Sequence, residues 1–162
     1  MCGLQCGDAL QPERKHELTI REFAESDVDD VRRLFVQLTG HETTRKTVEE
    51  RFVYFRGSTV EFLFVAEEDG KVAGLCGFRI RENVEDDTRF GEISVLVVDE
   101  TVRRQGIAAQ FVNFMEALAR EKRCIGLWLV SGFGREEHAH EFYKRQGFRI
   151  NGYRFVKDFK KD

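Results

Sequence analysis

Hydrophobic and polar residues alternate along the chain with two different periods, and the period predicts which segments are strands and which are helices. Alternating or continuous apolar runs predict strands at residues 17–23, 62–67, 72–80, 89–98 and 124–130. Apolar positions three and four residues apart predict helices at residues 26–38, 47–57, 107–119 and 135–146. The pair Asp69-Gly70 indicates a hairpin, and residues 148–159 are expected to add one or two strands.

The order of these elements predicts the fold class. The sequence β-α-α-β-β-β-α-β-α-β, with or without a further strand, gives a six- to seven-stranded sheet flanked by about four helices. Only the later βαβαβ part can contribute parallel pairing, so we expect an α/β (α+β) domain with a mixed, mostly antiparallel sheet. Residues 1–16 lack apolar periodicity and are expected to be a mobile leader before one domain at residues 17–162.

Composition narrows the classes of protein. With 162 residues, 41% hydrophobic and 34% charged, the chain is expected to be one folded domain rather than disordered or membrane-inserted. The net charge is −3 and no basic block is present, which disfavours nucleic-acid binding. The first residues hold no apolar secretory segment, so a cytoplasmic location is the default expectation. The four cysteines stand at no metal-ligand spacing, and we expect no metal.

The stretch from residue 89 to residue 119 is the most informative part of the chain. It predicts a buried strand, a short turn and an amphipathic helix, with Gly106 where the turn becomes the helix. Backbone N–H groups of residues 104–109 would point from the open helix end, where a pyrophosphate can be held without a dedicated basic side chain. The alternative is that Gly106 only eases a tight turn and that Arg103 and Arg104 are solvated.

Two motifs carry a resemblance to a known family. Arg103-x-x-Gly106-x-Ala108, between the strand and the helix, resembles the acyl-CoA signature (Arg/Gln-x-x-Gly-x-Gly/Ala) of the GNAT superfamily of N-acetyltransferases. Residues 139–148, AHEFYKRQGF, are similar to the family's Ala-x-x-Phe-Tyr-x-x-x-Gly-Phe segment. Both motifs stand at the family's separation with the matching order of elements, and the resemblance covers residues 17–160.

The resemblance implies an acetyl-CoA site. The backbone of Leu96, Val97 and Val98 would pair with the pantetheine arm, in a gap where this strand splays from its parallel neighbour at 124–130. A backbone N–H near Leu96 would stabilise the oxyanion of the tetrahedral intermediate, worth about 3–4 kcal/mol in other acyl-transfer enzymes. The cofactor would also contact the following residues: Arg103, Arg104, Gln105, Gly106, Ile107, Ala108, Ala109, Ala139 and Tyr143.

Two side chains are candidates for proton transfer. Glu92 lies 11 residues before Arg103, the interval between the glutamate base and the signature in the superfamily's protein-lysine acetyltransferases. It is expected to share strand parity with Ser94, Leu96 and Val98; the alternative is a solvated glutamate without a catalytic role. Tyr143 stands where the family often has a tyrosine that protonates the leaving thiolate, although it could instead be a core aromatic.

The sequence leaves the acceptor open. Six acidic residues would suit a cationic primary amine of a small molecule, unless they are ordinary solvated residues: Glu49, Glu50, Glu82, Glu85, Asp86 and Asp87. Alternatives are a protein lysine or N-terminal acetyltransferase and a non-catalytic module that binds acyl-CoA and regulates. Similar proteins often form homodimers, but no interface can be read from the sequence.

Overall fold

A computed structural model describes residues 18–132 and 136–159 of the chain. The predicted N-terminal leader and the predicted start of the last helix at Arg135 lie outside these residues. The strands are β1 (Leu18–Glu22), β2 (Glu61–Glu68), β3 (Lys71–Glu82), β4 (Arg89–Val98) and β5 (Leu127–Leu129). The helices are α1 (Val28–Thr39), α2 (Arg45–Gly57), α3 (Ile107–Glu121) and α4 (Glu141–Arg145), with a π-helical segment, Glu136–His140, before α4.

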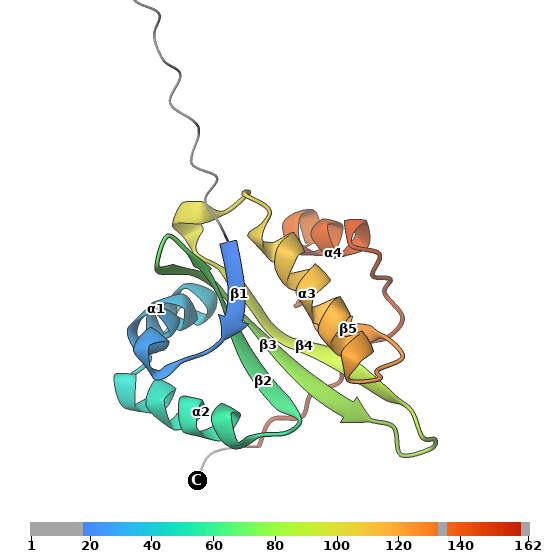
Figure 1. Cartoon of the computed structure of the whole chain (residues 1–162). Coiled ribbons are helices and arrows are strands. Elements are labelled where there is room, and N and C mark those ends of the chain that lie inside the picture. Colours follow the sequence, from blue (N-terminus) through green and yellow to red (C-terminus); the bar gives the residue numbers. More distant parts are fainter. Residues whose placement is uncertain (1–17, 133–135, 160–162) are drawn as a thin grey trace, which may run out of the picture.

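The strands form one mixed sheet in the order β1-β2-β3-β4-β5 (Figure 1). The pairs β1–β2, β2–β3 and β3–β4 are antiparallel, and β4 pairs with β5 in parallel. The predicted fold class is therefore confirmed, including the parallel partner of the strand at 89–98. The predicted count of six to seven strands is wrong for the described residues, which form five.

The missing strands are those predicted at 148–159. This segment has no regular structure, and beyond the half-buried Phe148 its large apolar side chains are exposed, with Phe155 93% and Tyr153 84% accessible. The preceding strand, β5, is also shorter than the predicted 124–130. Apolar, strand-forming residues were present, but a strand also needs a hydrogen-bonding partner, and the described part of the chain provides none for this segment.

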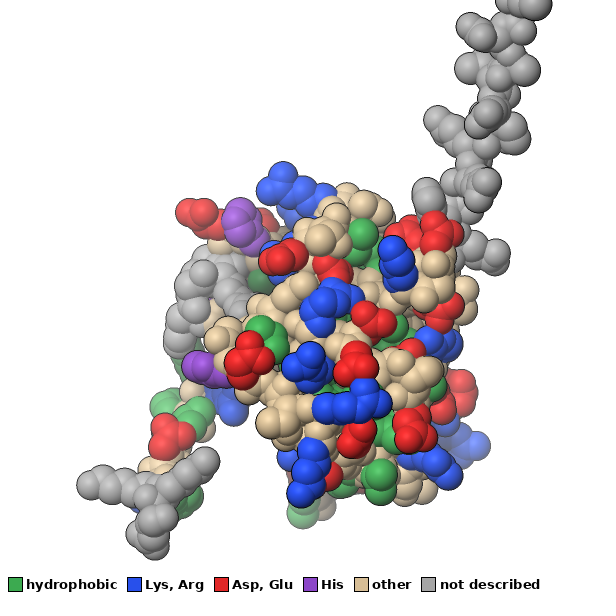
Figure 2. All heavy atoms as spheres, turned by 90° about the vertical axis from the view of Figure 1, so that its left-hand side faces the viewer, with side chains coloured by type: hydrophobic (Ala, Val, Ile, Leu, Met, Phe, Trp, Pro, Cys, Tyr) green, Lys and Arg blue, Asp and Glu red, His purple; other side chains and the backbone are tan. Residues whose placement is uncertain are grey.

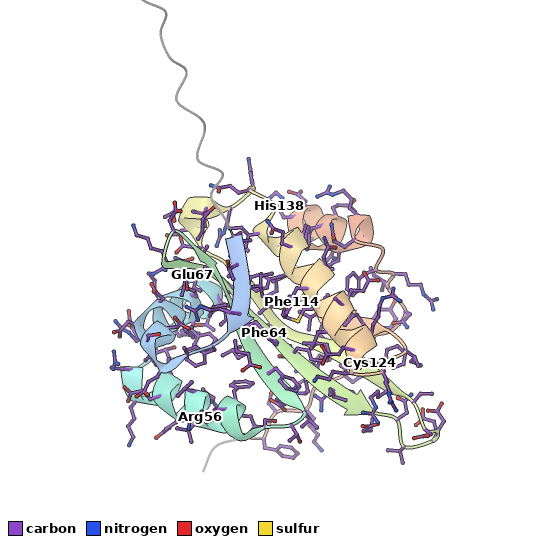
Figure 3. All side chains as sticks on the ribbon, viewed as in Figure 1. Arg56, Phe64, Glu67, Phe114, Cys124 and His138 are labelled. Atoms are coloured by element: carbon purple, nitrogen blue, oxygen red, sulfur yellow. The ribbon has the colours of Figure 1, made fainter. Side chains whose placement is uncertain are left out.

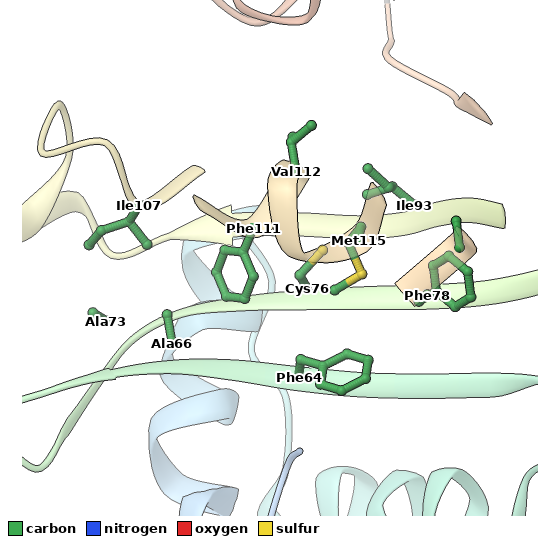
Figure 4. Packing of buried hydrophobic residues seen from close by; sticks show 11 residues of the cluster. Phe64, Ala66, Ala73, Cys76, Phe78, Ile93, Ile107, Phe111, Val112 and Met115 are labelled. Atoms are coloured by element: carbon green, nitrogen blue, oxygen red, sulfur yellow. The ribbon is translucent and has the colours of Figure 1, made fainter. Parts of the chain in front are cut away.

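The two faces of the sheet carry two separate cores. Helices α1 and α2 cover one face and α3 covers the other (Figure 1). The core under α1 and α2 includes Leu34 of α1 and Leu75 of β3, both fully buried. The core under α3 is shown in Figure 4, where Phe111 and Met115 point from the helix towards the sheet.

Aromatic contacts tie α3 to the sheet. The rings of Phe64 on β2 and Phe114 on α3 meet edge to face with centroids 5.0 Å apart (Figure 3). Gly74 of β3 leaves room for a second ring of α3, because a Cβ atom there would lie 2.9 Å from the ring of Phe111. The start of α3 is thereby held in a fixed position relative to β3 and β4.

The first two helices begin elsewhere than predicted. The first helix, predicted from residue 26, begins at Val28, and just before it the buried carboxylate of Asp27 accepts a hydrogen bond from the Ala24 N–H, at 2.8 Å. Asp27 also pairs with Arg21 of β1, at 2.7 Å. Helix α2 begins two residues early, at Arg45, because Thr44 accepts a hydrogen bond from the Thr47 N–H.

No helix in residues 18–132 and 136–159 is long and apolar enough to cross a membrane.

Candidate active site

A β-bulge in β4 determines how the site is built. Gly77 of β3 lies opposite Val95, but the next residue, Phe78, lies opposite Ile93, so Ser94 is an extra residue in the ladder. A Cβ atom on Gly77 would lie 2.5 Å from the Ser94 hydroxyl oxygen. Glycine at position 77 therefore leaves room for the bulge.

The bulge exchanges the two faces of β4. Before it, Ile93 packs in the core under α3; after it, Val95 and Val97 pack in the core under α1 and α2. Glu92, opposite Arg79, consequently lies on the α1–α2 face, whereas Leu96 packs on the α3 side. The predicted shared parity of Glu92 with Leu96 and Val98 is wrong, because a one-residue insertion reverses the alternation.

The bulge also reverses which neighbouring strand, β3 or β5, the backbone N–H of every second residue faces. The Gly91 N–H donates to Gly126 O next to β5, but the Asp99 N–H donates to Ala73 O next to β3. Successive residues of a strand direct their N–H and C=O groups to opposite sides. Since Asp99 faces β3, Val97 also faces β3, whereas Leu96 and Val98 face away from it.

That edge of β4 is open. Parallel pairing with β5 runs from Gly91–Leu127 to Ile93–Leu129 and stops there, although β4 continues to Val98. Within the described residues, the strands therefore separate at the bulge. Leu96 presents its N–H to the resulting gap, which is the geometry required of a pantetheine rail and an oxyanion donor.

The turn after β4 leads into the N-terminus of α3. Gly106 is the N-cap residue with φ +84°, and Arg104 also has a positive φ of 66°. The Gln110 N–H makes the first helical bond, to Gly106 O. The N–H groups of residues 106–109 donate to no acceptor in the described chain, as expected for a helix start, and the helix dipole makes this end favourable for an anion.

A buried carboxylate holds this turn in place. Asp99, 5% exposed, accepts hydrogen bonds from both the N–H and the hydroxyl of Thr101 and pairs with Arg33 of α1. Gln37 of α1 accepts a further hydrogen bond, from the Glu100 N–H, at 3.1 Å. These contacts of Asp99 were not predicted from the sequence. The feature that could have indicated them is an acidic residue directly after a buried strand.

Arg103 adds a contact at the start of the turn. Its Nε donates to the Val98 carbonyl oxygen at 3.3 Å, so the side chain folds back over the end of β4. Ala108 and Ala109 lie in the first turn of α3 and are half-buried, whereas Ile107 is buried and anchors the helix in the core. Gln105 is exposed.

Glu92 lies in a cluster of charges. Its Oε2 accepts a hydrogen bond from Arg81 at 2.6 Å and lies 3.5 Å from Arg79, and its side chain is 12% exposed. Arg79 in turn pairs with Glu61 at 2.6 Å. Both arginines contact Oε2, so Oε1 has lone pairs left to accept a hydrogen bond from an amine or a water molecule.

A cavity of about 410 Å³ opens beside this cluster. It lies between α1, α2 and strands β2 to β4, and Val95, next to Leu96, forms part of its wall. Its lining residues are Phe35, Thr39, Thr43, Thr47, Arg51, Tyr54, Phe55, Glu61, Leu63, Arg79 and Val95. This volume suits a small molecule.

The acidic residues expected at the mouth of the acceptor site do not line this cavity. Glu49 pairs with Arg45, Glu50 with Lys46, and Asp86 accepts hydrogen bonds within the β3–β4 loop. These acidic residues are therefore ordinary solvated side chains, which was the alternative considered from the sequence.

The second motif lies in the π-helical segment and α4. Tyr143 is half-buried, and its ring contacts those of Phe142 and Phe148 with centroids 5.1 and 5.8 Å away. Ala139 is half-buried one turn earlier, in the π-helical segment. The predicted helix is thus confirmed from residue 136 to residue 145, and the packing of Tyr143 is compatible with both roles considered for it.

Two observations bear on other chemistries. The Cys76 thiol lies opposite Leu96 in the ladder but is fully buried, and burial raises its pKa far above the ordinary value. It is therefore not available as an acyl-accepting thiolate.

Among residues 18–132 and 136–159, no group of three or more His, Cys, Asp or Glu side chains could hold a metal ion.

Comparisons with known proteins agree with this geometry. The model of the acetyltransferase (GNAT) family matches residues 28–148. The aminoalkylphosphonate N-acetyltransferase of Salmonella typhimurium (strain LT2) is 26% identical over 138 residues, which cover 85% of this chain and 89% of that protein.

Solved structures share the fold. The glucosamine-6-phosphate N-acetyltransferase of Arabidopsis thaliana superposes with a TM-score of 0.76 at 23% identity, covering 89% of this chain and 99% of the other. An aminoglycoside N-acetyltransferase in complex with CoA gives a TM-score of 0.78 at 19% identity, covering 94% and 99%. At these low sequence identities, the superpositions show a shared fold and do not identify a substrate.

The family match spans the bulged strand, the glycine turn, α3 and the Phe142-Tyr143 motif. The chain belongs to the acetyltransferase (GNAT) family and is an acetyl-CoA-dependent N-acetyltransferase.

Proposed function

We propose that the protein transfers the acetyl group of acetyl-CoA to the primary amine of a small molecule held in the cavity between α1, α2 and the sheet. The observation that carries this proposal is the bulge at Ser94. It directs the Leu96 N–H to the open edge of β4 while placing Glu92 and Val95 on the side of the cavity. A thioester on one side and an amine on the other would meet at the same point of β4.

The cofactor would follow β4 and the turn after it. The pantetheine arm would pair with the outward peptide groups of Leu96 and Val98, although the Val98 carbonyl also accepts a hydrogen bond from Arg103. The pyrophosphate would accept hydrogen bonds from N–H groups of residues 104–109. Gly106, with open space around its Cα, leaves the phosphates room to approach the backbone. The turn thus binds and the strand takes part in the reaction.

The chemistry would be direct attack. The neutral amine attacks the thioester carbonyl carbon, and the Leu96 N–H stabilises the oxyanion. The proton lost by the amine goes to Glu92, directly or through water. The carbon–sulfur bond then breaks, and the departing thiolate takes a proton from the Tyr143 hydroxyl.

Similarity to an enzyme named for aminoalkylphosphonates supports a small amine as the acceptor. The size of the cavity also favours a small molecule over a lysine side chain of a protein. Release of free thiol from acetyl-CoA with a panel of small amines tests the proposal. We expect thiol release with at least one of them; CoA binding without thiol release for any small amine would favour the non-catalytic module or a protein acceptor.

The role of Tyr143 has its own test. We expect Tyr143→Phe to lower kcat about 100-fold while leaving the Kd of acetyl-CoA unchanged, because only the proton donor is lost and the ring packing remains. Phe148→Leu, which changes a ring packed on Tyr143 without touching the hydroxyl, is the control. An unchanged kcat in Tyr143→Phe would show that the tyrosine serves packing alone.

We also propose that the enzyme forms a homodimer through its C-terminal segment. The large apolar side chains of residues 150–159 are exposed, and Figure 2 shows the green side chains of this segment standing clear of the body of the protein. A second copy would bury them. Light scattering is expected to give twice the chain mass and Phe155→Asp to give the monomer; a monomeric wild type would refute the dimer.

A further inference from the structure

The cavity has two chemically different ends. At the sheet end, Glu61 and Arg79 pair with each other, and Arg79 also approaches Glu92. At the helix end, the lining residues come from α2 and from the loop before it, and they are mostly hydrogen-bond donors. Because the proposed reaction takes place at the sheet end, the helix end is available to bind the rest of the acceptor.

The helix end holds a cation that has no ion-pair partner among the described residues. Arg51 lines the cavity, and no carboxylate in the described chain lies within 4 Å of its guanidinium. Arg45, earlier in the same helix, is neutralised by Asp29 and Glu49. Among the lining residues that the structure describes, Glu61 is the one carboxylate against two arginines, so these side chains carry a net positive charge.

Hydroxyl groups surround Arg51. Thr47, Arg51 and Tyr54 stand at spacings of four and three residues and so lie on one face of α2, towards the cavity. Thr43 lines the same end, and neither its hydroxyl nor that of Tyr54 has a hydrogen-bonding partner in the described residues. A guanidinium with two uncommitted hydroxyls provides donors suited to the oxygens of an anion.

We propose that this end of the cavity is an anion subsite centred on Arg51, and that the acceptor is therefore an amine that also carries a carboxylate, phosphonate or phosphate. The proposal rests on the function proposed above and names its substrate class. The anion binds Arg51, Thr43 and Tyr54, and the amine reaches the sheet end near Glu92. Such an acceptor is zwitterionic, which departs from the simple cationic amine expected from the acidic residues of the sequence.

Kinetics with matched amines test this assignment. The probes are 2-aminoethylphosphonate and β-alanine, as phosphonate and carboxylate arms, and propylamine, which lacks the anion. We expect wild-type kcat/KM to be at least about 10-fold higher for one anionic probe than for propylamine. Arg51→Ala is expected to raise the KM of that probe about 10- to 100-fold, with little change for propylamine.

Two further variants sharpen the test. Arg51→Lys keeps the charge but loses the two-pronged donor, and it should recover part of the affinity. Arg56→Ala removes an exposed arginine of α2 that does not line this cavity, and it should behave as wild type. Equal wild-type kcat/KM for all three probes, or an equal effect of Arg51→Ala on all three, would overturn the subsite. Absence of thiol release with every probe would instead contradict the proposed function itself.

Discussion

Replacing Glu92 with glutamine is expected to lower kcat about 100- to 1,000-fold at pH 7, because the amide cannot accept the proton of the attacking amine. The loss should shrink as pH rises, since a primary amine with a pKa near 10 deprotonates unaided at alkaline pH. The measurement is the pH profile of kcat for the wild type and for Glu92→Gln, with the Kd of acetyl-CoA determined in parallel.

A matched control separates catalysis from charge pairing. Glu92 accepts a hydrogen bond from Arg81, so its replacement also removes an ion pair. Glu82→Gln removes an exposed ion pair with Arg89 at the end of the same hairpin and should leave kcat unchanged. If Glu92→Gln turned over like the wild type at every pH, Glu92 would have no part in proton transfer.

Replacing Gly106 with valine is expected to weaken CoA binding about 10- to 100-fold. A β-branched residue at φ +84° costs about 1–3 kcal/mol, and its side chain would stand where the phosphates approach the backbone. Since nothing in the chain lies within 4 Å of the added Cβ, the loss would come from backbone conformation and from the ligand rather than from internal crowding. Calorimetric titration with CoA measures it.

Gly70 is the matched control for this substitution. It has φ +75° in the β2–β3 turn and equally open surroundings, so Gly70→Val carries the same backbone strain away from the site. The two variants should lose similar stability, but only Gly106→Val should lose CoA affinity. Equal CoA affinity in both variants would refute the phosphate cradle.

The sequence predicted the bounds of β4 but not the bulge within it. The bounds of β4 were predicted at 89–98 because the segment is strongly apolar and bounded by polar turns. The bulge at Ser94 could not be predicted, because the four residues after it are all apolar and their pattern does not show which face each one takes. For the same reason, Glu92 was wrongly predicted to lie on the same face as Leu96 and Val98.

The acceptor cavity was beyond sequence analysis for a different reason. Its walls come from α1, α2 and three strands, so Arg51 and Glu61 meet only through tertiary packing. On the sequence, Arg51 is one of many charged residues on an exposed helix. The strands predicted at 148–159 show the converse limit, since apolar residues alone do not supply a pairing partner.

Acetyl-CoA and the amine are expected to be bound together on β4 and to react directly. Initial velocities measured over a grid of acetyl-CoA and amine concentrations test it most directly. Direct attack predicts double-reciprocal lines that intersect, since both substrates must be bound before CoA leaves. Parallel lines, together with an acetylated protein after incubation with acetyl-CoA alone, would show a covalent intermediate and contradict it.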